Sequence, residues 1–160
     1  MILCVTGKMA AGKNYICSQY ENQGWLCKDA DKDVHQAIEL AKNDILAAFG
    51  TKAKEMNLNI QNNDGTLNRK ELGKLLFTSP ELLKKQEQIV YPYVISITKD
   101  FIAANKDKNI ILNATLLYKT PELLSLCDSI IYVKANLIKR IIRARKRDNL
   151  DRKSTRLNSS

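Results

Sequence analysis

A lysine near the amino terminus has the sequence neighbours of a phosphate ligand. Glycines let backbone N–H groups turn inward around an anion, and a helix amino terminus adds partial positive charge there. The segment has the spacing G-x-x-x-x-G-K between an apolar run and a helical pattern, and its residues are Gly7, Lys8, Met9, Ala10, Ala11, Gly12, Lys13 and Asn14. It predicts a phosphate-binding loop for ATP, in which Lys13 offsets charge that develops during phosphoryl transfer. The alternative is a glycine-bearing turn with a chance lysine.

The last position of this loop departs from the usual pattern. Ser or Thr normally stands there and gives its hydroxyl to Mg²⁺, whereas this chain has Asn14. An amide oxygen is a hard ligand that Mg²⁺ accepts, although the side chain is bulkier than a hydroxyl. We therefore expect Mg²⁺ as a cofactor with Asn14 as its protein ligand.

Two carboxylates follow the second apolar run of the chain. Asp29 and Asp31 come directly after Trp25–Lys28, which we interpret as a strand. Ligands of open α/β sheets bind at the carboxyl ends of the strands, so these side chains are expected beside the transferred phosphoryl group. A carboxylate there could accept the proton of an attacking hydroxyl. Alternatively, Asp31 or Asp33 only caps the helix that follows.

The elements that must position these groups alternate along the chain. Apolar runs predict strands at 2–6, 25–28, 109–113 and 129–133, with helical patterns between them. This alternation is typical of an α/β fold, with a parallel sheet flanked by helices. A long helical stretch over about 33–104 interrupts it as an insertion, in which Gly50 is expected to end one segment and Pro92 to break another.

The distribution of the net charge limits the function classes. The 160 residues carry a net charge of +9, which raises the possibility of a nucleic-acid-binding module. The excess is concentrated, however: residues 139–148 hold six Lys and Arg against one Asp, and they include no aromatic residue for base stacking. We therefore expect no nucleic-acid partner, and interpret this segment as a basic helix.

Apolar runs and cysteines indicate the compartment. No apolar run approaches the roughly 20 residues that span a bilayer, so no membrane association is expected. Cys4, Cys17, Cys27 and Cys127 show no zinc-ligand spacing and are interpreted as free thiols of a cytoplasmic protein. The single histidine, His35, is interpreted as a partly buried surface residue with no catalytic role.

Further motifs, in order along the chain, resemble those of the dephospho-coenzyme A kinase family. Asp29-Ala30-Asp31 is similar to the family's D-A-D, and 64–72 to D-G-x-L-x-R-x-x-L. Residues 87–92 are similar to E-x-I-x-H-P, and 113–118 to D-x-P-L-L-F. Arg143 with Arg147 and Asp148 is similar to the R-x-x-x-R-D at the start of the lid. The ordered set covers residues 1 to about 150.

The resemblance implies a P-loop kinase that uses ATP to phosphorylate the ribose 3′-hydroxyl of dephospho-coenzyme A, the last step of coenzyme A synthesis. Asp31 would be the base that takes the proton from the ribose 3′-hydroxyl. Lys13 would be a catalytic residue that holds the ATP phosphates. Asp29 and Arg69 would bind the acceptor, and Arg143 and Arg147 would close over ATP. The inserted helices would form the acceptor-binding region.

Several positions depart from the family pattern. Tyr91 replaces His, Asn113 replaces Asp, Thr115 replaces Pro and Lys119 replaces an acidic residue. Because Tyr91, Thr115 and Lys119 alter the acceptor side, another small-molecule or nucleoside kinase on the same scaffold stays an alternative.

The expected organisation is a single P-loop kinase domain over 1–150, with the helical insertion at about 33–104 and a partial lid helix at about 136–150. Residues 151–160 resemble the in-frame translation of a sequencing adapter and are interpreted as a non-native tail. The chain is accordingly expected to be a fragment that lacks the rest of the lid.

Overall fold

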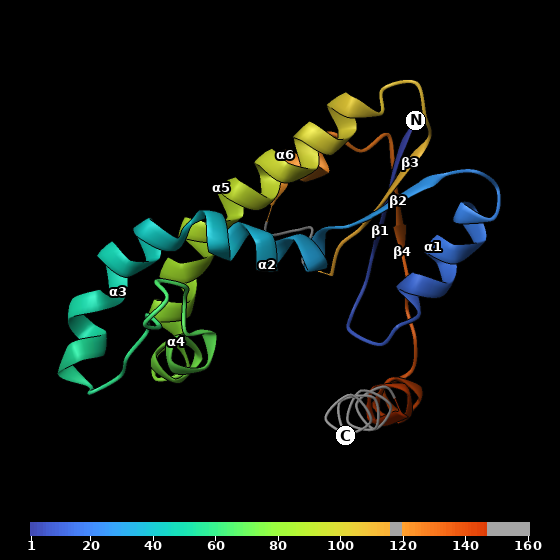
Figure 1. Ribbon diagram of the computed structural model, residues 1–160. Coiled ribbons are helices and arrows are strands. Elements are labelled where there is room, and N and C mark those ends of the chain that lie inside the picture. The colour runs from blue at the N-terminus through green and yellow to red at the C-terminus, as the bar shows by residue number, and fades with distance from the viewer. Residues whose placement is uncertain (116–119, 147–160) are drawn as a thin grey trace, which may run out of the picture. The chain divides into compact units, whose positions relative to one another are not determined.

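The structure, a computed structural model, describes residues 1–115 and 120–146 (Figure 1). The chain folds as two compact units. The first comprises Met1–Asp29 and the chain from Asn105 onward, and the second is Ala30–Ala104. We describe each unit in turn.

A parallel sheet forms the centre of the first unit. Its strands are β1 (Ile2–Thr6), β2 (Leu26–Asp29), β3 (Ile110–Asn113) and β4 (Ser129–Tyr132), in the order β2-β3-β1-β4. The expected α/β class with a parallel sheet is confirmed. The register places both Val5 and Asp29 opposite Asn113, so the carboxyl ends of three strands meet at one edge.

Helix α1 (Lys13–Glu21) lies beside this sheet (Figure 1), and α6 (Pro121–Leu124) precedes β4. Cys17 of α1 packs with Leu3, Val5 and Ile111 in the core of the unit. The expectation of four free thiols was wrong for one pair, since Cys4 and Cys127 form a disulfide. β1 and the segment before β4 bring these residues to a Cα–Cα distance of 5.9 Å across a sequence separation of 123, which no sequence spacing indicates.

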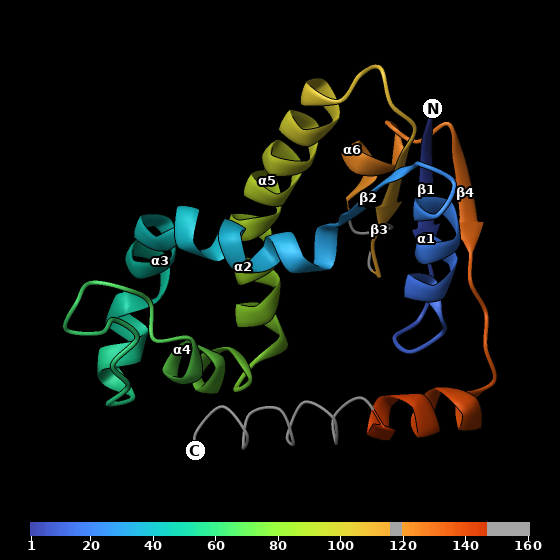
Figure 2. The same cartoon turned by 45° about the vertical axis from the view of Figure 1, so that its right-hand side comes forward.

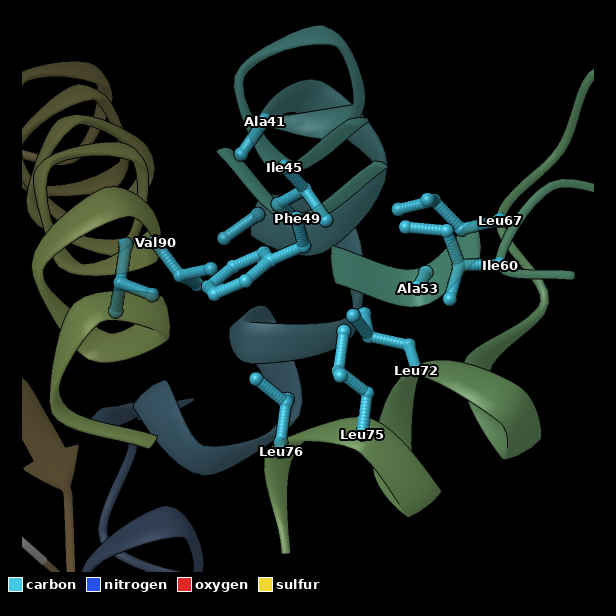
Figure 3. Packing of buried hydrophobic residues seen from close by; sticks show 12 residues of the cluster. Ala41, Ile45, Phe49, Ala53, Ile60, Leu67, Leu72, Leu75, Leu76 and Val90 are labelled. Atoms are coloured by element: carbon cyan, nitrogen blue, oxygen red, sulfur yellow. The ribbon is translucent and has the colours of Figure 1, made fainter. Parts of the chain in front are cut away.

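Four helices make up the second unit: α2 (Ala30–Leu40), α3 (Lys42–Glu55), α4 (Arg69–Leu76) and α5 (Pro80–Ala104). Their apolar faces converge on one core, where Phe49 extends toward Val90 and Leu72 lies near Leu75 (Figure 3). Ile45 and Leu75 are fully buried there. Burial of this kind stabilises by about 1.5–3 kcal/mol per large apolar side chain, which is enough to override weak helix breakers.

Two expected breaks are absent from these helices. Gly50 lies inside α3, because Phe49 and Ala53 on either side bury one helix face and offset the cost of about 1 kcal/mol for a helical glycine. The helix ends instead at Glu55, where Asn57 adopts φ 55° and the N–H of Leu58 donates to the carbonyl of Ala53.

Pro92 likewise lies inside α5, which is continuous over Pro80–Ala104. The proline removes one backbone N–H donor. Val90 and Val94 are buried on either side of it, and their packing keeps the helix in place.

Beyond β4, residues 137–146 are helical. No helix in the described ranges is long and apolar enough to cross a membrane. Lys119, Arg147, Asp148 and the tail at 151–160 lie outside the described residues, so the expectations for them are carried forward as predictions.

Candidate active site

The loop between β1 and α1 has the tight backbone that an anion cradle requires. Gly7 and Gly12 adopt φ values of 145° and 112°, and Ala10 adopts 60°. A Cβ atom on Gly7 would collide with the carbonyl of Val133, so only glycine fits at this point. The N–H of Ala11 donates to the carbonyl of Lys8 at 3.1 Å and closes the turn. The loop therefore leads directly into the amino terminus of α1, where an anion is favoured.

The ammonium group of Lys13 is buried at this loop, with 7% of the residue exposed. It donates to the carbonyl of Gly7 at 3.2 Å and to the hydroxyl of Thr115 at 2.8 Å. A buried ammonium is costly unless it is hydrogen-bonded, and these two acceptors lower that cost. Thr115, noted in the sequence only as a departure from the family pattern, is thus a partner of the predicted catalytic lysine.

Asn14 lies at the start of α1 and pairs with the carboxyl end of β3. The side-chain amide of Asn113 donates to Oδ1 of Asn14 at 2.9 Å. Asn113 is buried, and its own Oδ1 has no hydrogen-bond partner among the described residues. An amide oxygen that has no hydrogen-bond partner and is near Asn14 is a suitable ligand for a hard cation. The other ligands of such a cation would be phosphate oxygens and water. In the parts described, no group of three or more His, Cys, Asp and Glu side chains is arranged so that it could hold a metal ion.

The helix at 137–146 contacts the phosphate loop through two arginines. Arg143 donates from Nη1 to the carbonyls of Ala11 at 3.0 Å and Ala10 at 3.5 Å, and Arg140 donates from Nε to the carbonyl of Met9 at 2.9 Å. Figure 1 and Figure 2 both show this helix beside the loop. The structure thus brings Arg143 to the predicted ATP-binding loop. Arg140, one turn earlier, was missed, although its i, i+3 spacing to Arg143 puts the two on neighbouring positions of one helix.

The predicted carboxylates fall in different units. Asp29 ends β2 opposite Asn113, at the same sheet edge as the phosphate loop. Asp31 is exposed in the first turn of α2, in the second unit. Since α2 begins at Ala30, Asp31 is the second residue of the helix, where a carboxylate interacts favourably with the helix dipole. Asp33, the other capping candidate, is buried within the same first turn.

Arg69 begins α4 in the second unit, and Asn68 caps this helix by accepting from the N–H of Glu71 at 3.2 Å. The guanidinium contacts two residues of α2. Nη1 lies 2.8 Å from Nδ1 of His35, and Nη2 donates to Oε1 of Glu39 at 2.9 Å. Neither α2 residue could be assigned to the site from sequence, because no local pattern pairs residues 30 or more positions apart.

Cys17 lies on α1, and its buried thiol is suited to no nucleophilic role. A hydrogen bond with Cys27 and then burial raise the pKa of the Cys17 thiol far above its ordinary value. The protonated thiol is a poor nucleophile, so Cys17 is assigned to the packed core and not to the site.

Comparisons with known proteins agree with this geometry. A family model described as dephospho-CoA kinase matches residues 1–159. A dephospho-CoA kinase of Treponema pallidum is 34% identical over 152 residues, which are 93% of this chain and 72% of that protein.

Two solved structures share the fold. The crystal structure of TT1252 from Thermus thermophilus matches with a TM-score of 0.74 and 23% identity, over 96% of this chain and 75% of that one. Dephospho-CoA kinase from Campylobacter jejuni matches with a TM-score of 0.60 and 16% identity, over 92% and 96%.

Proposed function

The chain belongs to the dephospho-CoA kinase family. We propose which of its residues act in each part of the phosphate transfer from ATP to dephospho-coenzyme A. The family's activity is an ATP-dependent kinase reaction of coenzyme A biosynthesis. The observation that carries the proposal is the buried ammonium of Lys13, held inside a glycine loop at the amino terminus of a helix.

The loop residues bind the donor. Backbone N–H groups of Gly7–Asn14 surround the phosphates, and Lys13 exchanges the hydroxyl of Thr115 for phosphate oxygens when ATP binds. This exchange conserves the partners of a buried cation, so it costs less than desolvating a lysine from water. The lysine then offsets negative charge that develops on the transferred phosphoryl group.

Mg²⁺ fits the same edge of the sheet. Asn14 is the proposed ligand, and the unpartnered Oδ1 of Asn113 is suited to support it. When bound, the ion would neutralise charge on the β- and γ-phosphate oxygens. Two amides in place of a hydroxyl and a carboxylate make this a neutral site that relies on the phosphates for its negative charge.

The acceptor half of the reaction is assigned to Asp31, Asp29 and Arg69. The ribose 3′-oxygen attacks the γ-phosphorus, the bond from that phosphorus to the β,γ-bridging oxygen breaks, and ADP leaves. Asp31 takes the hydroxyl proton, for which its exposed position is suited. Asp29 and Arg69 bind the acceptor. The guanidinium of Arg69 donates hydrogen bonds to the diphosphate of the acceptor.

The lid arginines complete the donor site. Arg143 turns from the loop carbonyls to the phosphates, and Arg147, four positions later in the sequence, is proposed to act with it on ATP. Because Arg140 and Arg143 already bind the loop, the basic helix is assigned to ATP and not to a nucleic acid.

A product assay tests this assignment against the alternative of another kinase on the same scaffold. The full chain is incubated with ATP and Mg²⁺ and with dephospho-coenzyme A, nucleosides or other small alcohols in separate reactions, and ADP and the phosphorylated product are measured by mass spectrometry. We expect coenzyme A to be formed from dephospho-coenzyme A alone, with loss of rate and ATP affinity in Lys13→Ala. Preferential phosphorylation of another acceptor would overturn the assignment.

A further inference from the structure

Three hydrogen bonds hold the guanidinium of Arg69 in one orientation. Nη1 lies 2.8 Å from Nδ1 of His35, and Nη2 donates both to the carbonyl of His35 at 3.3 Å and to Oε1 of Glu39 at 2.9 Å. A guanidinium carries five N–H donors and no acceptor. Among the described residues, these bonds leave the Nε–H and one Nη1–H of Arg69 for a ligand.

The contact with His35 determines the state of the imidazole. Because the arginine can only donate, Nδ1 of His35 must accept, and the ring proton must be on Nε2. This bond therefore requires a neutral histidine. The neutral imidazole holds the guanidinium without cancelling the positive charge of Arg69. A second carboxylate in place of His35 would cancel that charge and weaken the attraction of Arg69 for an anionic ligand.

Rigid elements support both sides of this contact. His35 and Glu39 are four residues apart on α2, so they lie on one face of that helix. Ala37 and Ala41 are fully buried in the core of the same unit. Arg69 begins α4, whose Leu75 is fully buried.

The exposure of the pair argues against a role in stability alone. Side chains of Arg69 and Glu39 are 44% and 43% exposed, and an exposed ion pair of this kind contributes little to folding. The same exposure leaves the remaining donors of the arginine accessible to a bound anion.

We propose that His35 and Glu39 are positioning residues that orient Arg69 for the diphosphate of the acceptor, with His35 acting as a neutral hydrogen-bond acceptor. The inference rests on the proposed function, since it takes Arg69 as the ligand of dephospho-coenzyme A. It adds that the histidine, which touches no substrate, sets the affinity for this substrate through the arginine.

Two variants of His35 separate positioning from structure. His35→Leu removes the acceptor at Nδ1, and His35→Asn restores an oxygen close to the same place. Since ordering one long side chain opposes binding, we expect His35→Leu to raise KM for dephospho-coenzyme A about three- to tenfold. KM for ATP and the melting temperature should stay unchanged, and His35→Asn should restore most of the acceptor affinity. Glu39→Gln should raise the same KM by a smaller factor.

A double-mutant cycle makes the test independent of small effects on folding. In the Arg69→Ala background, where nothing remains to be positioned, His35→Leu should not change the dissociation constant for dephospho-coenzyme A measured by calorimetry. Equal effects of His35→Leu with and without Arg69 would overturn the inference and leave the role of Arg69 intact. An Arg69→Ala variant with normal acceptor affinity would overturn both.

Discussion

Lys13 donates a 2.8 Å hydrogen bond to the hydroxyl of Thr115, a residue 102 positions away that follows β3. This bond joins the helix that begins at the phosphate loop to the carboxyl end of the neighbouring strand. The ammonium is buried and would otherwise depend more heavily on the carbonyl of Gly7. The hydrogen bond to Thr115 explains how the nucleotide-free loop accommodates the buried ammonium of Lys13, which is proposed to bind phosphates.

Thr115→Val should therefore destabilise the nucleotide-free protein. Valine keeps the shape but removes the acceptor, and loss of a buried partner of a charged group costs about 1–3 kcal/mol. Thermal unfolding should show a lower melting temperature without ATP, and a larger upward shift when ATP is added. Thr115→Ser keeps the hydroxyl and serves as the control. Identical melting temperatures for the valine and serine variants would show that the bond contributes nothing.

Gly7→Ala tests the shape of the loop. The added Cβ would meet the carbonyl of Val133, and we expect a loss of about 3 kcal/mol or more in the free energy of unfolding. Gly24→Ala is the matched control, because Gly24 has φ 86° but nothing lies within 4 Å of its added Cβ. Left-handed strain alone should cost that variant about 1–2 kcal/mol. Urea denaturation measures both, and equal losses would contradict the proposed close approach.

Arg143→Ala should impair use of the donor. Removing a charge that is aimed at the phosphates should raise KM for ATP and lower kcat, together by about tenfold or more in kcat/KM. Arg145→Ala removes an exposed charge from the same helix, and no bond of Arg145 to the loop occurs in the described chain. That control should retain near-normal kinetics. Similar losses in both variants would indicate general attraction by the basic helix and not a specific contact.

Asn113→Asp should strengthen the proposed Mg²⁺ site by adding a carboxylate where an amide oxygen has no partner. We expect the Mg²⁺ concentration for half-maximal ADP binding, measured by calorimetry, to fall by about tenfold. Asn109→Asp introduces the same charge just before β3, at the opposite end of that strand. An equal response from this control would attribute the gain to net charge, and an unchanged Mg²⁺ dependence in Asn113→Asp would remove Asn113 from the site.

Local patterns were sufficient to predict the parts of the fold that are local. The phosphate loop combines a buried strand, glycines and a helix start within a dozen residues, so its location and the α/β class followed from the chain. Gly50 and Pro92 were wrongly expected to end helices, because burial of Phe49 and Val94 outweighs their intrinsic cost. Tertiary packing of this kind is invisible in a single segment.

The missed site residues have a common cause. Thr115, Asn113 and His35 act through partners at least 34 positions away in the sequence. Topology could have indicated the first two, since carboxyl ends of parallel strands meet at one edge. His35 depends on the loop that returns the chain to α4, and the disulfide of Cys4 depends on the path to β4. Neither path has a sequence signal of its own.

The assignment of Asp31 as the base is tested most directly by the rate of coenzyme A formation in Asp31→Asn. The amide keeps the size of the side chain but cannot take the ribose proton, so kcat should fall by about 10² or more while the ATP dissociation constant stays unchanged. Asp33→Asn, which removes a carboxylate from the same helix turn, is the control and should lose far less in kcat. A normal kcat in Asp31→Asn would contradict the account and reduce Asp31 to a favourable charge at the start of α2.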